Sequence, residues 1–260
     1  MSRFRHSPLG VIFPVCITFT VLLVIWTLVV RFANVHIFLP YPWEVGTAAI
    51  RLRFELLEAL WLTARAAISG FTLSLIFGTL VAICFSQSRP LRLGCFPYAV
   101  ILQTIPIVAI APLITYWNGP GYTSVTLISF MVSVFPIIAN VTAGLTSVDP
   151  GLIDLFRLNG ASRWQQITHL RIPHAIPDLL TGARTSAGLS VIGAIVGEFF
   201  AGSGTEGHGL GYQIPAQVNN FDVDEAFAFI AMAVLLGVTM FASVSLVRMT
   251  VLARWCDARD

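Results

Sequence analysis

Residues 149–173 read DPGLIDLFRLNGASRWQQITHLRIP, a polar block between long apolar runs. Asp149 followed by Pro150 is typical of a helix start, because the carboxylate can accept hydrogen bonds from free backbone N–H groups and the proline ring presets φ. Gly160 suits the left-handed position that closes a helix. The block is too short and too charged to span a bilayer. We therefore expect a helix that ends near residue 159 and lies at a membrane surface.

A second helix is predicted directly after the glycine. Ser162 and Gln165 have the spacing of a capping box, in which each side chain bonds the backbone N–H of the other residue. Pro173 lacks a backbone N–H and is expected to stop this helix. The block as a whole therefore predicts a helix, a glycine turn and a second helix. Its apolar contacts are expected from Leu152, Leu155, Phe156, Trp164 and Ile167.

The composition is that of an integral membrane protein. Hydrophobic residues make up 56% of the 260 residues and charged residues only 11%, with a mean hydropathy of +0.82. So few charges cannot cover a soluble domain of this length. The net charge of +2 argues against a nucleic-acid partner. The four cysteines have neither metal-ligand nor redox spacing, so we expect free thiols and no metal site.

Six apolar runs are long enough to cross a bilayer, because a helix of 20 residues rises about 30 Å. The predicted spans cover residues 11–32, 60–87, 94–117, 122–146, 176–201 and 226–250. The first run lacks a small-residue cleavage site and is expected to be a retained helix rather than a signal peptide. The predicted fold is an all-α integral membrane protein with a single transmembrane domain over residues 1–260. The block at 149–173 lies between its fourth and fifth transmembrane helices.

Arginine residues are distributed unevenly between the two sides that six spans define. With both termini in the cytoplasm, that side receives Arg3, Arg5, Arg89, Arg92, Arg157, Arg163, Arg171, Arg254 and Arg259. The opposite side receives Arg31, Arg51 and Arg53, and the loop at 202–225 carries acids but no arginine. Because basic residues are enriched in cytoplasmic loops, we expect both termini and the block to be cytoplasmic. The expected location is the inner or plasma membrane, with a multi-pass chain.

The block resembles the cytoplasmic-loop signature of permease subunits of ABC importers, which reads E-A-A, three residues, G, nine residues, I-x-L-P. Gly160 stands at the glycine, and residues 170–173 stand at I-x-L-P. The E-A-A positions fall on Asp154, Leu155 and Phe156, so a leucine and a phenylalanine replace the two alanines. In the family this loop docks into a cleft on the cytoplasmic ATPase.

The resemblance implies an ATPase-coupling site that consists of Asp154, Leu155, Phe156, Asn159, Gly160 and Ala161. The alternative is an ordinary amphipathic surface helix. Three further stretches resemble the nitrate, sulfonate and taurine branch of these permeases. They are residues 39–40 (LP), residues 117–121 (WNGPG) and residues 209–212 (GLGY).

The resemblance implies a permease subunit that forms the translocation pathway for a small solute. An extracytoplasmic binding protein would deliver the solute, and a separate ATPase subunit would bind and hydrolyse ATP. The chain itself would then need no cofactor and would not be an enzyme. Because one chain supplies one membrane half, a homodimer surrounded by lipid is expected. The substrate stays open among small organic acids, sulfonates, inorganic anions and vitamin precursors.

Glu198 and Arg184 are the ionisable residues deepest in a predicted span. A charge at that depth is costly unless it is paired or meets water. Their separation of 14 residues corresponds to about 20 Å along a helix, so no salt bridge between them is expected. An acidic residue stands at the position of Glu198 in the related branch, so the resemblance favours a gate or dimer-interface role for Glu198, and Arg184 is the second candidate. A structural role against a neighbouring helix stays open.

Two other classes of membrane protein compete with this interpretation. An ion-coupled secondary transporter would require ionisable residues clustered at mid-membrane and an inverted repeat, and the sequence shows neither. An intramembrane hydrolase would require a nucleophile with a base, or a metal motif, and none stands out. The glycine-rich residues 202–211 lack the G-K-[ST] ending of a phosphate loop, and the chain contains no lysine.

Overall fold

The computed structural model describes residues 8–33, 38–201 and 207–256, and helices make up its regular elements. In chain order these are α1 (Pro8–Ala33), α2 (Pro42–Arg51), α3 (Arg53–Gln87), α4 (Arg89–Thr104), α5 (Ile107–Asn118), α6 (Tyr122–Thr146), α7 (Pro150–Leu158), α8 (Arg163–Gln166), α9 (Ile172–Ala201), α10 (Leu210–Asn219) and α11 (Val223–Cys256). A π-helical turn, η1 (Ile167–Arg171), joins α8 to α9. The predicted all-α class is confirmed.

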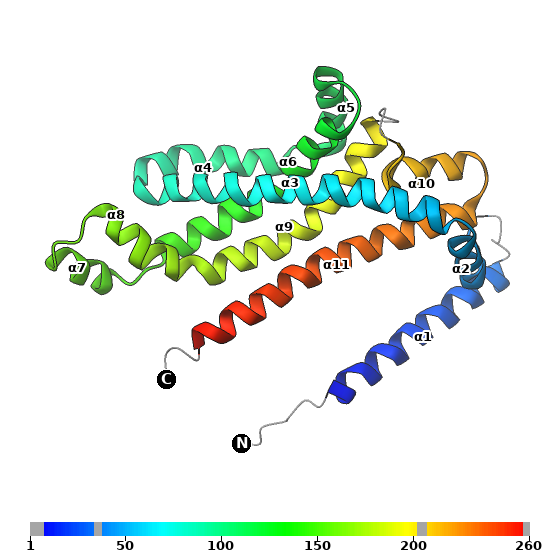
Figure 1. Cartoon of the computed structure of the whole chain (residues 1–260), viewed down its shortest axis with the longest axis horizontal. Helices are drawn as coiled ribbons and strands as arrows, with labels where there is room; N and C mark the ends of the chain where they lie inside the picture. The colour runs from blue at the N-terminus through cyan, green and yellow to red at the C-terminus, as the bar shows by residue number, and fades with distance from the viewer. Residues whose placement is uncertain (1–7, 34–37, 202–206, 257–260) are drawn as a thin grey trace.

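Helices α3, α6 and α9 form the centre of an elongated bundle (Figure 1). Glycines allow close approach, since a Cβ on Gly193 of α9 would lie 2.7 Å from the Cα of Ser129 on α6. Serine hydroxyls also form hydrogen bonds between these helices. Ser74 of α3 lies 2.7 Å from Ser133 of α6, and Ser186 of α9 donates to the Ser133 carbonyl at 2.6 Å. Small residues and interhelical hydroxyl bonds are the usual means by which helices associate in lipid.

Five helical segments are long and apolar enough to cross a membrane, and α4 with α5 makes a sixth if the bent pair is one crossing. The span expected at 94–117 is thus broken, because α4 and α5 meet at 94°. The break lies at Ile105, whose ψ of 124° is extended, directly before Pro106. Proline disfavours helical backbone in the preceding residue, so α4 ends there.

The expectation that Pro173 stops the second helix of the block is wrong. Helices α8 and α9 form one helical segment of 39 residues from Arg163 to Ala201, joined by η1. In η1 the N–H of Ile172 donates to the carbonyl of Ile167, five residues back. This wider turn accommodates a ring that has no N–H and that would clash with a carbonyl of a regular helix. The second helix of the block is therefore the beginning of α9's crossing.

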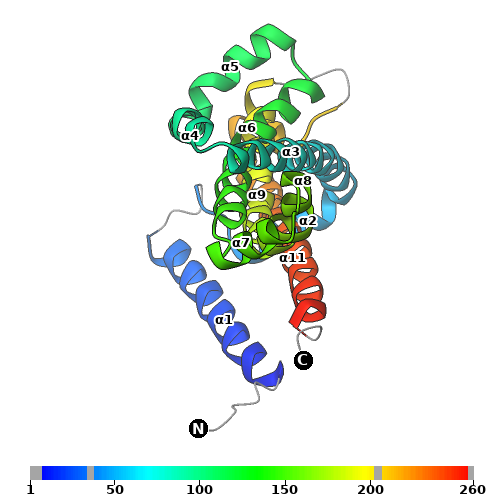
Figure 2. The ribbon, with the colours of Figure 1, turned by 90° about the vertical axis from the view of Figure 1, so that its left-hand side faces the viewer.

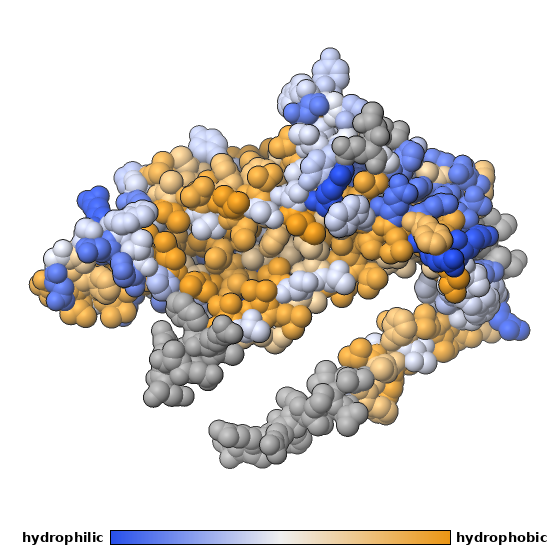
Figure 3. Space-filling model, viewed as in Figure 1, coloured by the Kyte–Doolittle hydropathy of each residue, from blue (hydrophilic) through white to orange (hydrophobic). Residues whose placement is uncertain are grey.

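The ends of the bundle differ from its middle. Apolar residues cover the middle, whereas polar residues gather at the end with α7 and α8 and at the end with α2 and α10 (Figure 3). Helix α1 begins, and α11 ends, toward the end that carries α7 and α8 (Figure 1). Figure 2 shows α1 standing apart from the α3–α6–α9 centre. The start of α1 and the end of α11 thus lie toward the same end of the bundle, as an even number of membrane crossings requires.

Candidate functional site

Helix α7 begins and ends as the sequence predicts. The carboxylate of Asp149 accepts a hydrogen bond from the N–H of Gly151 at 2.6 Å, which caps the first turn. Gly160 has φ of +73°, a left-handed conformation that favours glycine. The N–H of Ala161 then donates to the carbonyl of Phe156 at 3.0 Å and satisfies one of the last free carbonyls. The predicted N-cap and glycine turn are confirmed.

The capping box after the turn is also confirmed. The Ser162 hydroxyl accepts from the N–H of Gln165 at 3.2 Å, and the Gln165 side chain accepts from the N–H of Ser162 at 2.8 Å. Gln166, which is buried, donates to the carbonyl of Ala161 at 3.1 Å. These bonds fix the angle between α7 and α8. We refer to residues 149–166 as the α7–α8 block.

The α7–α8 block extends beyond the end of the bundle (Figure 1), and α7 carries exposed apolar side chains. The exposed fractions of Leu152, Leu155 and Leu158 are 46%, 52% and 87%. Their spacing of three residues places them along one side of α7. Phe156, an expected coupling residue, is only partly exposed. Leu158 does not belong to the family signature, and its spacing from Leu155 is the signal that could have identified it.

The polar members of the expected coupling site are Asp154, on α7, and Asn159, the residue that caps its end. Asp154 is exposed and pairs with Arg157 at 3.2 Å between Oδ1 and Nη1. Both side chains are about two-thirds exposed, so this ion pair contributes little to stability. The side-chain amide of Asn159 donates to the carbonyl of Leu155 at 2.8 Å and closes the last turn. Asp154 thus remains accessible, whereas Asn159 has a structural role.

Glu198 lies near the end of α9 and is only 7% exposed. Its Oε2 accepts hydrogen bonds from the hydroxyl of Thr63 on α3 at 2.9 Å and from the N–H of Gly211 on α10 at 2.8 Å. The N–H of Leu210 donates to the Thr63 oxygen at 2.9 Å. Thr63 and Glu198 together therefore hold the first turn of α10 against two helices of the bundle centre.

These contacts explain why glycine is required at positions 209 and 211 of the GLGY sequence. A Cβ on Gly209 would collide with the Glu198 carboxylate, and a Cβ on Gly211 would collide with the backbone carbonyl of Ile195. Neither glycine has a positive φ, so the requirement is close approach rather than backbone conformation. Sequence reasoning identified Glu198 but missed Thr63, because nothing local to Thr63 marks it.

Arg184 has a different environment from Glu198. Its guanidinium lies over the ring of Phe241 on α11, 4.1 Å from the ring centre. Such a cation–π contact partly offsets the cost of placing an arginine within a span. In the part of the chain that the structure describes, no ion pair joins Arg184 to Glu198. Both residues lie on the single helix α9, 14 positions apart.

An apolar groove of about 750 Å³ lies along α9 and α11, and we call it the α9–α11 groove. Its walls include Gly188 and Ile192 of α9 and Gly237 and Phe241 of α11. No ionisable side chain of the described residues lines it. A Cβ on Gly188 or on Gly237 would meet no atom within 4 Å. The groove is therefore open space at both glycines.

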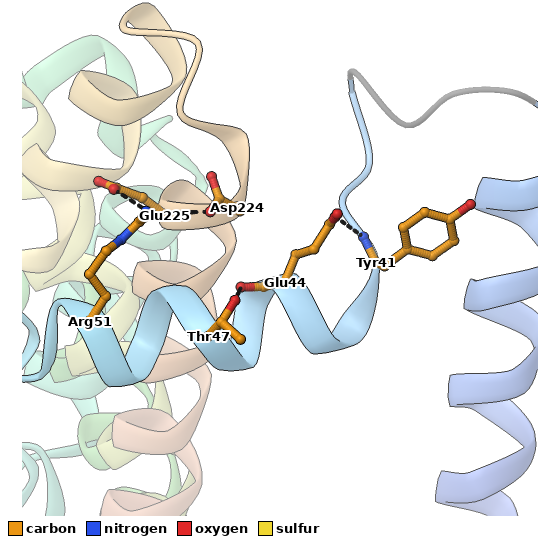
Figure 4. A network of polar contacts seen from close by, with 6 residues as sticks. All are labelled: Tyr41, Glu44, Thr47, Arg51, Asp224 and Glu225. Atoms are coloured by element: carbon orange, nitrogen blue, oxygen red, sulfur yellow. Dashed lines mark hydrogen bonds and ion pairs between the residues drawn. The ribbon is translucent and has the colours of Figure 1, made fainter.

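At the opposite end of the bundle from the α7–α8 block, α2 is tied to α11. Arg51 of α2 pairs with Asp224 at 3.3 Å and with Glu225 at 2.8 Å, both in the first turn of α11 (Figure 4). The N–H of Tyr41 donates to the side chain of Glu44 at 2.8 Å and fixes the start of α2. The sequence placed Arg51 and these acids on one side of the membrane without pairing them.

Comparison with known proteins gives one consistent family. Residues 74–255 match the family described as binding-protein-dependent transport system inner membrane component. The chain is 33% identical to the riboflavin transport system permease protein RibX of Chloroflexus aurantiacus, over 98% of this chain and 93% of that protein. It is 32% identical to the formylaminopyrimidine transport permease protein ThiX of Halalkalibacterium halodurans, over 87% of this chain and 89% of that protein.

Other matches agree with the fold and with the branch. A solved structure of the inward-facing MetNI methionine ABC transporter contains a chain with a TM-score of 0.64 and 19% identity. The likeness covers 78% of this chain and 97% of that chain, and at this identity it concerns the fold. Permease proteins for aliphatic sulfonates and for taurine are also similar in sequence. The predicted resemblance to the sulfonate and taurine branch is confirmed.

Proposed function

The chain belongs to the family of binding-protein-dependent transport system inner membrane components, and from this premise we propose that its α7–α8 block receives the ATPase. The chain is a permease subunit of an ABC importer, which excludes the alternative of an ion-coupled secondary transporter. ATP is bound and hydrolysed by the separate ATPase subunit. The coupling residues that we propose are Asp154 and Leu155 together with Leu152 and Leu158.

The exposed apolar side of α7 carries this proposal. Three leucines exposed at a polar end of the bundle would be unfavourable in water, and a cleft on a partner would bury them. The left-handed Gly160 and the two caps hold α7 rigidly on α8. Because α8 continues into α9, a displacement of α7 by the ATPase would pass directly into a membrane-crossing helix.

Site-specific cross-linking tests this assignment. A photoreactive side chain at Leu155 should cross-link the ATPase in the assembled importer, whereas the same group at Asn220, exposed after α10, should not. Both positions are exposed, so the pair controls for reactivity. Cross-linking to the ATPase from Asn220, or from neither position, would contradict the assignment.

A homodimer completes the membrane part, because the chain supplies up to six crossings and an importer of this type requires two membrane halves. An extracytoplasmic binding protein docks at the end that carries α2 and α10. Co-expression of two differently tagged copies tests the dimer, since either tag should then purify both copies. Recovery of one tag without the other would contradict it.

The α9–α11 groove forms a wall of the translocation pathway. Gly188→Leu adds a side chain in open space, so the fold should be retained while transport falls. Gly94→Leu on α4 is the matched control, because Gly94 also has no atom near its missing Cβ and does not line the groove. Uptake by membranes with equal amounts of each variant is the measurement. Equal uptake by the two variants would exclude the groove from the pathway.

The substrate is an uncharged or weakly charged vitamin-type heteroaromatic compound. Among the described residues, the groove is lined by aliphatic side chains and the ring of Phe241. The guanidinium of Arg184 is stacked on that ring and does not line the groove, so no lining cation meets a sulfonate or an inorganic anion. Two relatives are named for riboflavin and for formylaminopyrimidine transport. Uptake of radiolabelled riboflavin, formylaminopyrimidine and taurine by the complete importer distinguishes the classes. Preference for taurine would overturn the assignment.

A further inference from the structure

Three arginines line one polar pocket of about 320 Å³ beside the α7–α8 block, and we call it the arginine pocket. They are Arg157 of α7, Arg163 of α8 and Arg171 of η1. The opposite wall is the end of α3, at Ser86 and Gln87. No carboxylate lines the pocket among the described residues. Arg157 is paired with Asp154 at 3.2 Å, although that carboxylate does not line the pocket, so Arg163 and Arg171 supply the excess positive charge.

The wall of the arginine pocket is ordered by hydrogen bonds. Arg171 donates from Nη1 to the carbonyl of Ser86 at 2.9 Å, across the boundary between η1 and α3. Gln166 lines the pocket, is only 9% exposed, and donates to the carbonyl of Ala161. The guanidinium of Arg163 makes no hydrogen bond or ion pair with any described residue. Arg163 is thus the cation that remains available to a ligand.

An apolar path begins directly beside this pocket. Ile83 lies one helical turn before Ser86 on α3, and Ile172 follows Arg171. Both line a second, apolar cavity of about 60 Å³ between α3, α6 and α9. Farther along α3, Leu80 is 57% exposed and continues the apolar surface toward the middle of the bundle. A cavity of about 60 Å³ is too small for an acyl chain. An anionic head with an apolar chain therefore matches the arginine pocket together with the exposed apolar side of α3.

We propose that the arginine pocket binds the phosphate headgroup of an anionic phospholipid, with one acyl chain lying along Ile83 and Leu80. Arginine binds phosphate through paired N–H donors, and basic pockets between the ends of membrane helices are typical headgroup sites. A free anion would use the arginines but leave the apolar path unfilled. An acidic side chain of a protein partner would do the same. The pocket shares Arg157 and Arg163 with the α7–α8 block, so lipid retention and ATPase binding must be measured separately.

Native mass spectrometry of the full-length purified permease tests the site. The protein is mixed with equal amounts of phosphatidylglycerol and phosphatidylcholine, and the retained lipid is measured. We expect phosphatidylglycerol to be retained preferentially. Arg163→Gln should lower its retention about fivefold, the factor that corresponds to one cation near an anionic headgroup. Arg163→Lys should keep most of the retention, and Arg92→Gln, an arginine of α4 that does not line the pocket, should have no effect.

Competition experiments test whether a free anion or the ATPase occupies the pocket instead of a lipid. Inorganic phosphate and glycerol phosphate carry the head chemistry without an acyl chain, and neither should displace the lipid. Adding the ATPase should leave the lipid in place. Equal retention of both lipids, displacement by phosphate, displacement by the ATPase, or equal effects of Arg163→Gln and Arg92→Gln would each overturn the proposal. Loss of lipid retention with normal ATPase binding would leave the coupling proposal intact.

Discussion

At the scale of single residues, Glu198 shows how a carboxylate is accommodated inside a membrane protein. Its Oε2 receives one hydroxyl and one backbone N–H, from Thr63 and Gly211, and glycine at 209 leaves room for the rest of the carboxylate. A buried charge without such donors would be strongly unfavourable. The contacts join α3, α9 and α10 at one point. Glu198 is therefore a candidate for holding α10 in place during transport.

Two substitutions of Glu198 test its charge and its hydrogen bonds separately. Glu198→Gln keeps an oxygen that can accept from Gly211, but a neutral acceptor forms a weaker bond than a charged one. We expect normal assembly and lost or uncoupled transport. Glu198→Ala leaves the Gly211 N–H without its acceptor and should lower stability by about 1–3 kcal/mol. Thermal unfolding, uptake and ATPase stimulation are the measurements.

Thr63→Val is the companion variant, because it removes the other donor without touching the carboxylate. It should weaken the attachment of α10 and resemble Glu198→Ala in stability. If Glu198→Gln shows wild-type uptake and wild-type ATPase stimulation, the charge of Glu198 is not needed for transport and its role is structural.

Gly160 can be tested through its backbone conformation alone. A Cβ at this position would meet no atom within 4 Å, so the cost of substitution comes from φ of +73° and not from a clash. Gly160→Val should cost about 1 kcal/mol or more, tilt α7 on α8, and reduce ATPase co-purification and uptake. Gly160→Asn should be milder, because asparagine tolerates the left-handed region. Equal ATPase binding by both variants would contradict a requirement for this turn.

At the scale of helices, the continuous segment from α8 to α9 changes how the α7–α8 block works. A helix that stopped at Pro173 would leave a flexible joint between the block and the membrane. The π turn η1 removes that joint and makes α8 the outer end of a crossing helix. We therefore expect a displacement of the block to move α9 and, through the hydrogen bond between Glu198 and Gly211, to move α10.

The exposed side of α7 gives a prediction at this scale. Leu155→Asp places a charge on an exposed side chain, so the permease should remain stable while the ATPase no longer co-purifies and uptake is lost. Phe156→Asp should also release the ATPase, but with a loss of stability, because Phe156 is partly buried. Leu91→Asp is the control, since Leu91 is an exposed leucine at the start of α4 outside the block. Retained ATPase and normal uptake in both block variants would remove α7 from the coupling site.

At the scale of the whole molecule, the two polar ends must lie on opposite sides of the membrane. The arginine distribution predicts that the α7–α8 end lies in the cytoplasm. In a background without native cysteines, Ser162→Cys should react with an impermeant thiol reagent only after cells are opened. Asn220→Cys should react in intact cells, and both positions are exposed. Labelling of Ser162→Cys in intact cells would overturn the topology. Thr205, another position expected outside, lies beyond the described residues.

The sequence by itself determined the local features of this protein. The N-cap at Asp149, the left-handed Gly160 and the capping box at Ser162 involve residues at most a few positions apart, so spacing predicts them. The apolar spans follow from composition, and the family signature follows from the order of residues in the block.

Tertiary structure alone decided the rest. Thr63 and Glu198 meet across 135 positions of sequence, and Arg171 reaches Ser86 across 85, so no local pattern marks these pairs. The passage of the helix through Pro173 depends on a π turn that spacing did not predict. The physical reason is the range of the contacts. A capping bond forms within one turn of the chain, so residue spacing predicts it. The donors to Glu198, the walls of the arginine pocket and the sides of the α9–α11 groove come from different helices, which only packing brings together.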